Sequence, residues 1–154
     1  MHPVPGTDLT LHPLIAEWFA RSFKAPTEPQ RLAWPLVEAG RDVLVSAPTG
    51  SGKTLAAFLV SLDRLVRAAD HGPLPDQTQV LYVSPLKALS NDVQKNLERP
   101  LAEIAALAAE RGARLPSITM ALRTGDTPVR ERQQFTRRPA HLVITTPESL
   151  YILL

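Results

Sequence analysis

The chain has 154 residues, about the length of one domain, and its 44% hydrophobic and 21% charged residues exclude a wholly disordered protein. Lys and Arg number 17 and Asp and Glu number 15, so the formal charge of +2 excludes a polycationic protein. The chain has no cysteine, which excludes disulfides, and its four histidines are too scattered in sequence to suggest a metal site. No apolar run approaches the ~18 residues that a membrane-spanning helix needs. The N-terminus has no signal-peptide pattern, and we expect a cytoplasmic protein with no membrane partner.

Two helices are predicted at the start of the chain. Apolar side chains at helical spacing predict the first helix over 13–21. Thr27 is a suitable N-cap for a second helix that stops at Gly40, and Pro35 predicts a kink or a break within that helix. We expect residues 1–40 to form a helical lead-in to the domain that follows.

From residue 41 onward, predicted strands and helices alternate. Strands are expected over 42–46, 79–84, 117–122 and 141–145, and helices over 52–67, 86–111, 128–135 and 148–154. Pro100 predicts an interruption or a new cap in the helix over 86–111. Apolar strands that alternate with helices are typical of an α/β fold in which helices cover both faces of a parallel sheet. Because the last helix has no cap, we expect 41–154 to be an incomplete domain of this class.

The segment 47–54 has the pattern of a phosphate-binding loop, and it lies between a predicted strand and a predicted helix. Gly50 and Gly52 allow backbone conformations that turn successive N–H groups onto phosphate oxygens, and the helix N-terminus adds a positive dipole. Lys53 supplies a full charge to the β- and γ-phosphates, and the Thr54 hydroxyl can complete the shell of a Mg²⁺ ion. Ala47 stands where the strict pattern has its first glycine. The predicted nucleotide-binding residues are Ala47, Pro48, Thr49, Gly50, Ser51, Gly52, Lys53 and Thr54, of which Lys53 and Thr54 are the catalytic candidates.

Five segments carry a family resemblance, and they follow one another in the family's order. They are FKAPTEPQ at 23–30, APTGSGKT at 47–54, SPLKALSND at 84–92, RTGDT at 123–127 and TTPESL at 145–150. With these motifs the chain resembles the N-terminal part of the first RecA-like domain of superfamily 2 DEAD/DEAH-type ATP-dependent helicases, and it is most similar to the Lhr (large helicase-related) family. The resemblance implies a RecA-like P-loop NTPase fold, ATP and Mg²⁺ as cofactors, and movement along single-stranded DNA rather than RNA in replication or repair.

Gln30 and Phe23 fit the F-x-x-P-T-x-x-Q pattern of the family's Q motif. A carboxamide has both acceptor and donor groups, so Gln30 can bond an adenine edge in two directions, which favours ATP over GTP. The alternative for Gln30 is an exposed residue on a helix face, and for Phe23 we expect ordinary core packing.

Three more motif segments follow predicted strands, at the edge where open α/β sheets bind ligands. The resemblance implies that they contact the phosphodiester backbone of a single strand through Ser84, Lys87, Ser90, Arg123, Thr124, Gly125, Thr145, Thr146 and Glu148. A solvated turn is the alternative for 84–90, and capping of the last helix by Thr146 or Ser149 is compatible with the nucleic-acid contact. The five arginines between 123 and 138 could attract nucleic acid, but a solvated helix face is the commoner explanation.

Two parts of a complete motor are not in this sequence. One is the acidic box that orients Mg²⁺ and the attacking water, and the other is the second RecA-like domain, which the resemblance implies as a partner. Because phosphoryl transfer depends on positioning and charge stabilisation, we expect a fragment that binds nucleotide weakly at best and does not hydrolyse it. Two other classes remain open: a non-catalytic nucleotide-dependent nucleic-acid-binding module and a small-molecule P-loop kinase.

Overall fold

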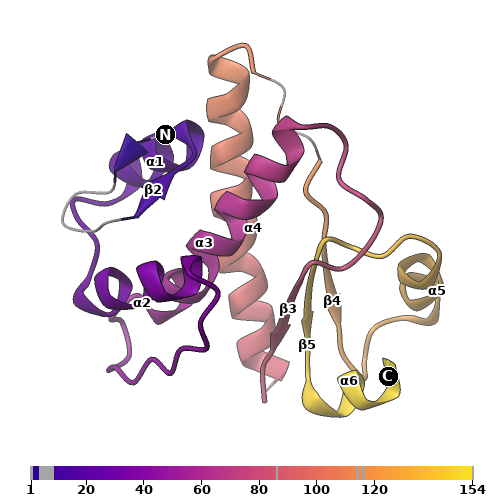
Figure 1. Ribbon diagram of the computed structural model, residues 1–154. Helices are drawn as coiled ribbons and strands as arrows, with labels where there is room; N and C mark the ends of the chain where they lie inside the picture. The colour runs from indigo at the N-terminus through magenta and orange to yellow at the C-terminus, as the bar shows by residue number, and fades with distance from the viewer. Residues whose placement is uncertain (1, 4–8, 86, 114, 116, 154) are drawn as a thin grey trace. The chain divides into compact units, whose positions relative to one another are not determined.

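A computed structural model describes residues 2–3, 9–85, 87–113, 115 and 117–153, with side chains described for all of these except 2–3, 87–92 and 95 (Figure 1). The chain divides into two compact units. Unit 1 comprises Met1–His71 and Glu103–Leu115, and unit 2 comprises Gly72–Ala102 and Pro116–Leu154. The predicted boundary between residues 40 and 41 falls inside unit 1 and stays a prediction.

Unit 1 is mainly helical. Its elements are the short antiparallel pair β1 (His2–Pro3) and β2 (Thr10–Leu11), the helices α1 (Pro13–Ser22), α2 (Glu28–Glu38) and α3 (Lys53–Asp70), and the last residues of α4 (Lys87–Glu110). The helices α1, α2 and α3 confirm the helices expected in this part of the chain. The long helix α3 packs against α2, and it buries Phe58, Leu59, Leu62 and Val66 at helical spacing.

The helix α2 is a single helix, so the predicted break at Pro35 is wrong, whereas the alternative of a kink stays a prediction. A proline removes one hydrogen-bond donor, but its own carbonyl remains an acceptor. The Ala39 N–H donates to the Pro35 carbonyl at 3.1 Å, so helical bonding resumes directly after the proline. Trp34, which is fully buried, fixes this part of α2 in the core.

The strand predicted over 42–46 is not formed, which is the main correction to the expected fold. Residues 41–48 have no assigned secondary structure, although Val43 and Val45 are half-buried and Leu44 between them is 95% exposed. This alternation is typical of an extended segment with one inward face. A strand also needs a hydrogen-bonded neighbour, and the described strands of the parallel sheet pair only with one another.

Unit 2 contains the parallel sheet, which has the order β3 (Val80–Val83), β5 (Leu142–Thr145), β4 (Met120–Arg123). Figure 1 shows β5 between its two neighbours. All of its residues are buried, and because successive strand residues point to opposite faces, both faces of β5 are covered. The α/β class with a parallel sheet is thereby confirmed.

The strand β4 begins three residues later than the predicted strand over 117–122. Met120 is the residue that pairs with Leu142, the first residue of β5, so earlier residues have no partner in the ladder. The Thr119 carbonyl still accepts from the Leu142 N–H at 3.1 Å, but the Thr119 N–H donates to the ring Nδ1 of His141 at 2.9 Å and not to a strand carbonyl. The partner strand therefore sets where β4 begins.

The helices of unit 2 are the first part of α4, α5 (Val129–Arg137) and α6 (Pro147–Leu153), which confirm the predicted elements at these places. The helix α4 runs continuously through Pro100, so the predicted interruption is wrong. Buried Val93 and Leu97 before the proline and Ile104 and Leu107 after it follow one helical stripe. Packing of that stripe offsets the single hydrogen bond that the proline removes. No helix of the described residues is long and apolar enough to cross a membrane.

Candidate functional site

The loop before α3 has the backbone geometry of a phosphate-binding loop. Gly50 and Gly52 have φ angles of +79° and +82°, a left-handed conformation that other residues avoid. Gly52 is the N-cap of α3, so Lys53 and Thr54 are the first residues of the helix. The N–H groups of this first turn have no acceptor within the helix, which makes them donors for an anion.

The Lys53 side chain lies against its own loop. Its Nζ donates to the carbonyl of Ala47 and, at 2.5 Å, to the carbonyl of Pro48. The ammonium group therefore sits inside the curve of residues 47–53, at the position where a loop of this kind receives phosphate. Thr54 is half-buried on the same turn.

The start of α2 is bonded to the same loop through Thr27 and Gln30. The Gln30 Nε2 donates to the Gly52 carbonyl at 3.1 Å, and the Thr27 hydroxyl donates to the Ser51 carbonyl at 2.8 Å. The Gln30 Oε1 also accepts from the Thr27 N–H at 3.0 Å, which closes one half of a capping box. Gln30 is 4% exposed, so the alternative of an exposed helix residue is wrong. Its contact with adenine stays a prediction.

Phe23 packs at the margin of the core. Its ring stacks on Phe19 with centroids 5.1 Å apart and meets Trp18 edge-on at 5.8 Å. The side chain is nevertheless 42% exposed, so ordinary core packing describes only one side of the ring.

A groove of about 480 Å³ runs between α2 and residues 43–48, inside unit 1. Its walls include the apolar side chains of Leu32 and Leu36 on α2 and Leu44 opposite them, and it ends at Ala47, Pro48 and Ser51 of the P-loop. Sequence reasoning did not predict this groove, because it depends on how an unpaired extended segment lies against a helix.

The donor set of the loop fits a magnesium-bound nucleoside triphosphate. The Ser51 hydroxyl is buried and has no hydrogen-bond partner among the described residues, so one polar atom of the loop remains available. Lys53 would hold the phosphates, and the hydroxyl of Thr54 would complete the Mg²⁺ shell together with phosphate oxygens. Within the described part of the chain, no group of three His, Cys, Asp or Glu residues could hold a metal without such a ligand.

Three motif segments predicted to bind nucleic acid meet at one edge of the sheet in unit 2. Thr145 at the end of β5 is in register with Val83 at the end of β3 and with Arg123 at the end of β4. The Ser84 N–H donates to the Thr145 carbonyl at 2.9 Å, and the Thr145 hydroxyl donates to the Arg123 carbonyl at 2.6 Å. The expectation that the three loops leave the same sheet edge is confirmed.

Most of these residues are buried at that edge. Ser84, Arg123, Thr124, Thr145 and Thr146 are all less than 9% exposed, whereas Gly125 and Glu148 are exposed. The Thr145 side chain is fully buried and already bonded. Lys87 and Ser90 begin α4, but their side chains lie outside what the structure describes. The nucleic-acid contacts of the whole set stay predictions.

Thr146 also acts toward the helix that follows it. Its hydroxyl lies 3.3 Å from the Ser149 Oγ and accepts from the Ser149 N–H at 3.4 Å. These long bonds at the start of α6 agree with the capping alternative, which leaves the nucleic-acid contact open.

The 123–127 loop, which follows β4, is closed by its own hydrogen bonds. The Thr127 N–H donates to the Thr124 carbonyl at 3.1 Å, and the Thr127 hydroxyl accepts from the Thr124 N–H at 2.8 Å. Arg123 is 8% exposed and donates from Nη1 to the Thr124 carbonyl at 3.2 Å. Burial lowers the pKa of the Arg123 guanidinium, and the nearby charge of Arg132 lowers this pKa further.

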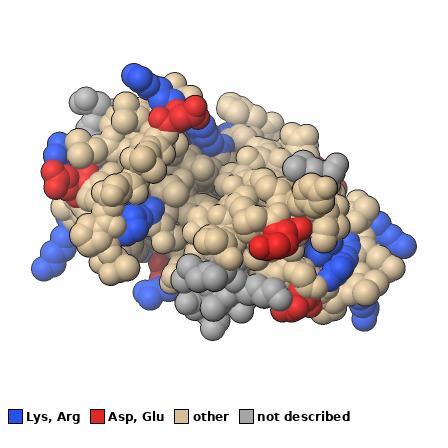
Figure 2. All heavy atoms as spheres, turned by 90° about the horizontal axis from the view of Figure 1, so that it is seen from below, with Lys and Arg blue, Asp and Glu red and all other residues tan. Residues whose placement is uncertain are grey.

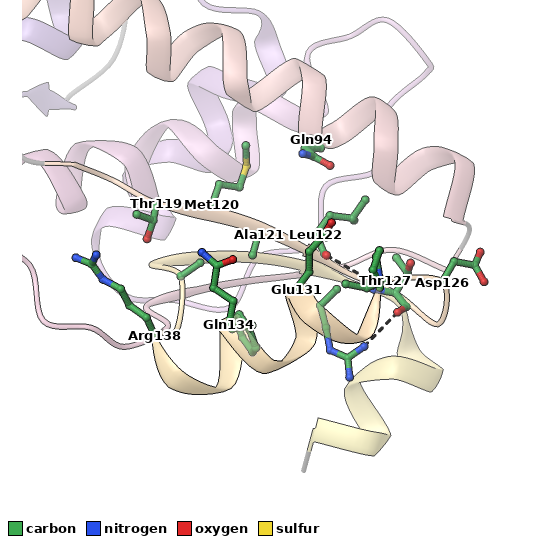
Figure 3. A pocket seen from close by; sticks show the side chains of 15 residues that line it. Gln94, Thr119, Met120, Ala121, Leu122, Asp126, Thr127, Glu131, Gln134 and Arg138 are labelled. Carbon is green, nitrogen blue, oxygen red and sulfur yellow. Dashed lines mark hydrogen bonds between the residues drawn. The ribbon is translucent and has the colours of Figure 1, made fainter.

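Beside this loop lies a pocket of about 650 Å³ (Figure 3). Met120 and Leu122 of β4 form part of its wall, while Gln134 enters from α5, Arg138 from the residue that follows α5, and Gln94 from α4. Figure 3 shows the Thr127 side chain at the loop end of this pocket. Arg123, Thr124, Asp126 and Thr127 of the 123–127 motif also line this pocket, but the sequence did not predict it, because its wall is completed by side chains of α5 and by Gln94 of α4.

Charge is mixed on the face of the molecule seen in Figure 2, where Lys and Arg side chains alternate with Asp and Glu. The arginines of α5 and its C-cap agree with a solvated helix face in most positions, because Arg130, Arg137 and Arg138 are exposed. Arg138 pairs with Asp76 at 3.1 Å. The exposed arginines are thus typical of a solvated helix face, and their attraction of nucleic acid stays a prediction.

A glycine loop that opens onto a helix beginning Lys-Thr, in a chain with a parallel α/β sheet, defines a P-loop NTPase domain of the RecA-like class. A family model described as DEAD/DEAH box helicase matches residues 27–154, and the chain belongs to this family.

The relatives narrow the resemblance to Lhr-type helicases. The chain is 53% identical over 144 residues to an ATP-dependent helicase Lhr-Core of Methanothermobacter thermautotrophicus, with 94% of this chain and 17% of the relative covered. It is 47% identical to a Lhr helicase/uracil glycosylase of Escherichia coli, with 92% of this chain and 10% of the relative covered.

Among solved structures, that of the Mycobacterium smegmatis helicase Lhr bound to ssDNA and AMP-PNP matches with a TM-score of 0.85 at 49% identity, covering 93% of this chain and 18% of that one. The DEAD-box helicase Mss116, at 19% identity and a TM-score of 0.75, supports the fold alone. The chain spans between 9% and 18% of the Lhr-type relatives that it matches.

Proposed function

We propose that this chain is the ATP-binding part of an ATP-dependent helicase or translocase that acts on single-stranded DNA in replication or repair in the cytoplasm. The observation that carries the proposal is the P-loop at the N-terminus of α3, with its two left-handed glycines and with Lys53 inside the curve of the loop. A second RecA-like domain is its proposed partner.

ATP and Mg²⁺ are the proposed cofactors. Each Gln30 amide atom uses one of its hydrogen-bonding positions inside the protein, which leaves a second N–H and a second lone pair for an adenine edge. The Ser51 hydroxyl, which has no partner among the described residues, and the hydroxyl of Thr54 supply further polar atoms to the same loop. Lys53 and Thr54 are the residues that we propose to contact the reacting phosphates and the metal.

DNA is the proposed nucleic acid because the Lhr structure that this chain resembles at 49% identity is a complex with ssDNA, and a second DNA complex, of the helicase MrfA, matches at 25% identity. The proposed track is the edge at which Arg123 and Thr145 end β4 and β5 and Ser84 directly follows β3. Main-chain and arginine donors at such an edge suit phosphates and read no base sequence.

The proposed nucleotide site predicts that substitutions of Lys53 and Gln30 lower nucleotide affinity in two different ways. Lys53→Ala should weaken binding of a fluorescent ATP analogue and of the matching GTP analogue alike, by about tenfold or more, because both lose a full positive partner for phosphate. Gln30→Ala should weaken the ATP analogue more than the GTP analogue, since only the adenine contact is specific. Fluorescence titration of both variants against the unchanged chain measures these losses. Equal losses for Gln30→Ala would show that Gln30 supports the loop without reading the base.

The proposed nucleic-acid interface predicts that loss of a phosphate contact lowers the affinity for DNA independently of base sequence. Arg123→Ala or Lys87→Ala should weaken binding of labelled poly(dT) and poly(dC) oligonucleotides equally, and each should lower the slope of log K against log salt by roughly 0.7. Arg137→Ala is a matched control, because Arg137 is exposed on α5 and lies outside the 123–127 motif. Fluorescence anisotropy over a salt series gives both quantities. A loss confined to one base sequence, with an unchanged slope, would contradict backbone contact.

A further inference from the structure

Arg132 differs from the other arginines of α5. Arg130 and Arg137 are exposed, whereas Arg132 is half-buried. Its Nε donates to the Thr127 carbonyl at 2.7 Å, and its Nη2 donates to the Gly125 carbonyl. In the described part of the chain it forms no ion pair with a carboxylate, so its charge is held by main-chain carbonyls alone.

These two bonds span the 123–127 loop. The planar guanidinium presents several N–H groups in a fixed fork, and here one fork reaches two carbonyls that lie two residues apart. Gly125 is exposed, and the other hydrogen bonds that close the loop join Thr124 to Thr127 and the Thr127 hydroxyl to the Leu122 carbonyl. The bonds from Arg132 therefore add a tie from α5 to the exposed part of the loop.

The loop in turn determines where Arg123 is held. The Arg123 guanidinium donates to the Thr124 carbonyl, and that same carbonyl accepts from the Thr127 N–H. A change at Thr127 thus reaches Arg123 through one shared acceptor. The charges of Arg123 and Arg132 are close enough to interact, and an arriving phosphate would relieve that repulsion.

We infer that Arg132 is a positioning residue, which holds the 123–127 loop so that Arg123 meets a backbone phosphate of the bound strand. This inference rests on the nucleic-acid interface proposed above. It assigns Arg132 a role distinct from the solvated arginines beside it.

The first test measures the stability of the 123–127 loop by hydrogen exchange in the absence of nucleic acid. In Arg132→Ala, amide hydrogen exchange at Thr124 and Thr127 should accelerate by about tenfold, because the bonds that hold the loop to α5 are lost. Arg130→Ala removes the same charge from the same helix and should leave both amides unchanged. Arg132→Lys should behave more like Arg132→Ala, since an ammonium group lacks the fork that spans both carbonyls. Unchanged exchange in Arg132→Ala, or full rescue by lysine, would overturn the positioning role.

The second test reads binding of a labelled poly(dT) oligonucleotide in a double-mutant cycle. Arg132→Ala should weaken binding by about fivefold or more, Arg130→Ala by less than about twofold, and Arg132→Ala should add little to Arg123→Ala because both act on one contact. Additive losses of affinity in the double variant would instead show that Arg132 acts by its own charge. Equal losses of affinity in Arg132→Ala and Arg130→Ala would show that both act only through the overall positive charge of the helix. If the unchanged chain binds no oligonucleotide, the proposed interface and its phosphate contact both fail, while the exchange experiment still decides whether Arg132 holds the loop.

Discussion

Gly52 combines two requirements in one residue. Its φ of +82° is strained for any residue with a Cβ, and a Cβ placed there would lie 2.4 Å from the Gln30 Nε2 and 3.3 Å from the Thr27 Oγ1. The positive φ is required by the course of the loop, and the lack of a Cβ is required by the packing of α2 against the loop. Gly50 has nearly the same φ but no atom within 4 Å of its Cβ position, so a substitution there tests the backbone strain without the steric contact.

Gly52→Ala should therefore cost more than Gly50→Ala. The backbone strain alone is worth about 1–2 kcal/mol, and the contact with Gln30 should raise the loss of unfolding free energy at Gly52 to roughly 2–4 kcal/mol. Urea unfolding of the two variants measures the difference.

The Gln30→Ala background provides the control for this prediction. Removal of the Gln30 side chain should make Gly52→Ala less costly, by about 1 kcal/mol or more, and should leave the cost of Gly50→Ala unchanged. Equal costs at the two glycines in the unchanged chain would mean that α2 does not press on the P-loop.

Among the elements of unit 1, α1 is tied to the end of α4 by charged side chains. Glu17 accepts from Arg21 at 2.8 Å and from Arg111 at 2.6 Å, and Arg21 also donates to Glu110 at 3.0 Å. The hydrogen bond from Arg111 is the main cause that lowers the pKa of Glu17 from its ordinary value of 4.5. The carboxylate is thus favoured in the folded chain.

This lowered pKa predicts a pH dependence with a definite sign. The contribution of Glu17 to stability is complete above the pKa of the unfolded chain and is lost as the pH falls through the lower pKa of the folded chain. Glu17→Gln should therefore lower the unfolding temperature by about 1–4 °C at pH 7, and the difference should vanish well below about pH 4.

Thermal unfolding followed by circular dichroism across this pH range checks the prediction. In an Arg111→Ala background the effect of Glu17→Gln should shrink, because the main partner is already gone. A difference that stays constant as the pH is lowered, with no decline toward acid pH, would show that the Glu17 side chain stabilises the helix pair by packing instead.

For the whole molecule, we expect nucleotide binding without nucleotide hydrolysis. The loop supplies N–H donors, Lys53 and Thr54 from one short segment, so binding needs little else from the chain. Hydrolysis also needs a carboxylate that orients the metal and water, and no two acidic residues are adjacent in the 154 residues.

We therefore expect the 154-residue chain to bind nucleotide and to release no more phosphate than its Lys53→Ala variant, with or without single-stranded DNA. A phosphate-release assay on both proteins checks this. DNA-stimulated release that Lys53→Ala abolishes would place a catalytic carboxylate among the 15 acidic residues of this chain.

Local sequence determined the P-loop, the helices and three of the four expected strands. Gly50, Gly52 and Lys53 act through their own backbone and charge, and the apolar stripe of α3 needs only its spacing. The α/β class followed from the same local signals, because alternating strands and helices admit few arrangements.

Tertiary structure alone decided the remaining features. Whether 42–46 becomes a strand depends on a neighbour in the ladder, and the start of β4 depends on where β5 begins. The bonds from Gln30 to Gly52 and from Arg132 to Gly125 join residues whose meeting is set by packing and by the course of a loop. Hydrogen-bond partners outside a residue's own segment leave no periodic trace in a sequence, since nothing local distinguishes a buried glutamine or a tethered arginine from a solvated one.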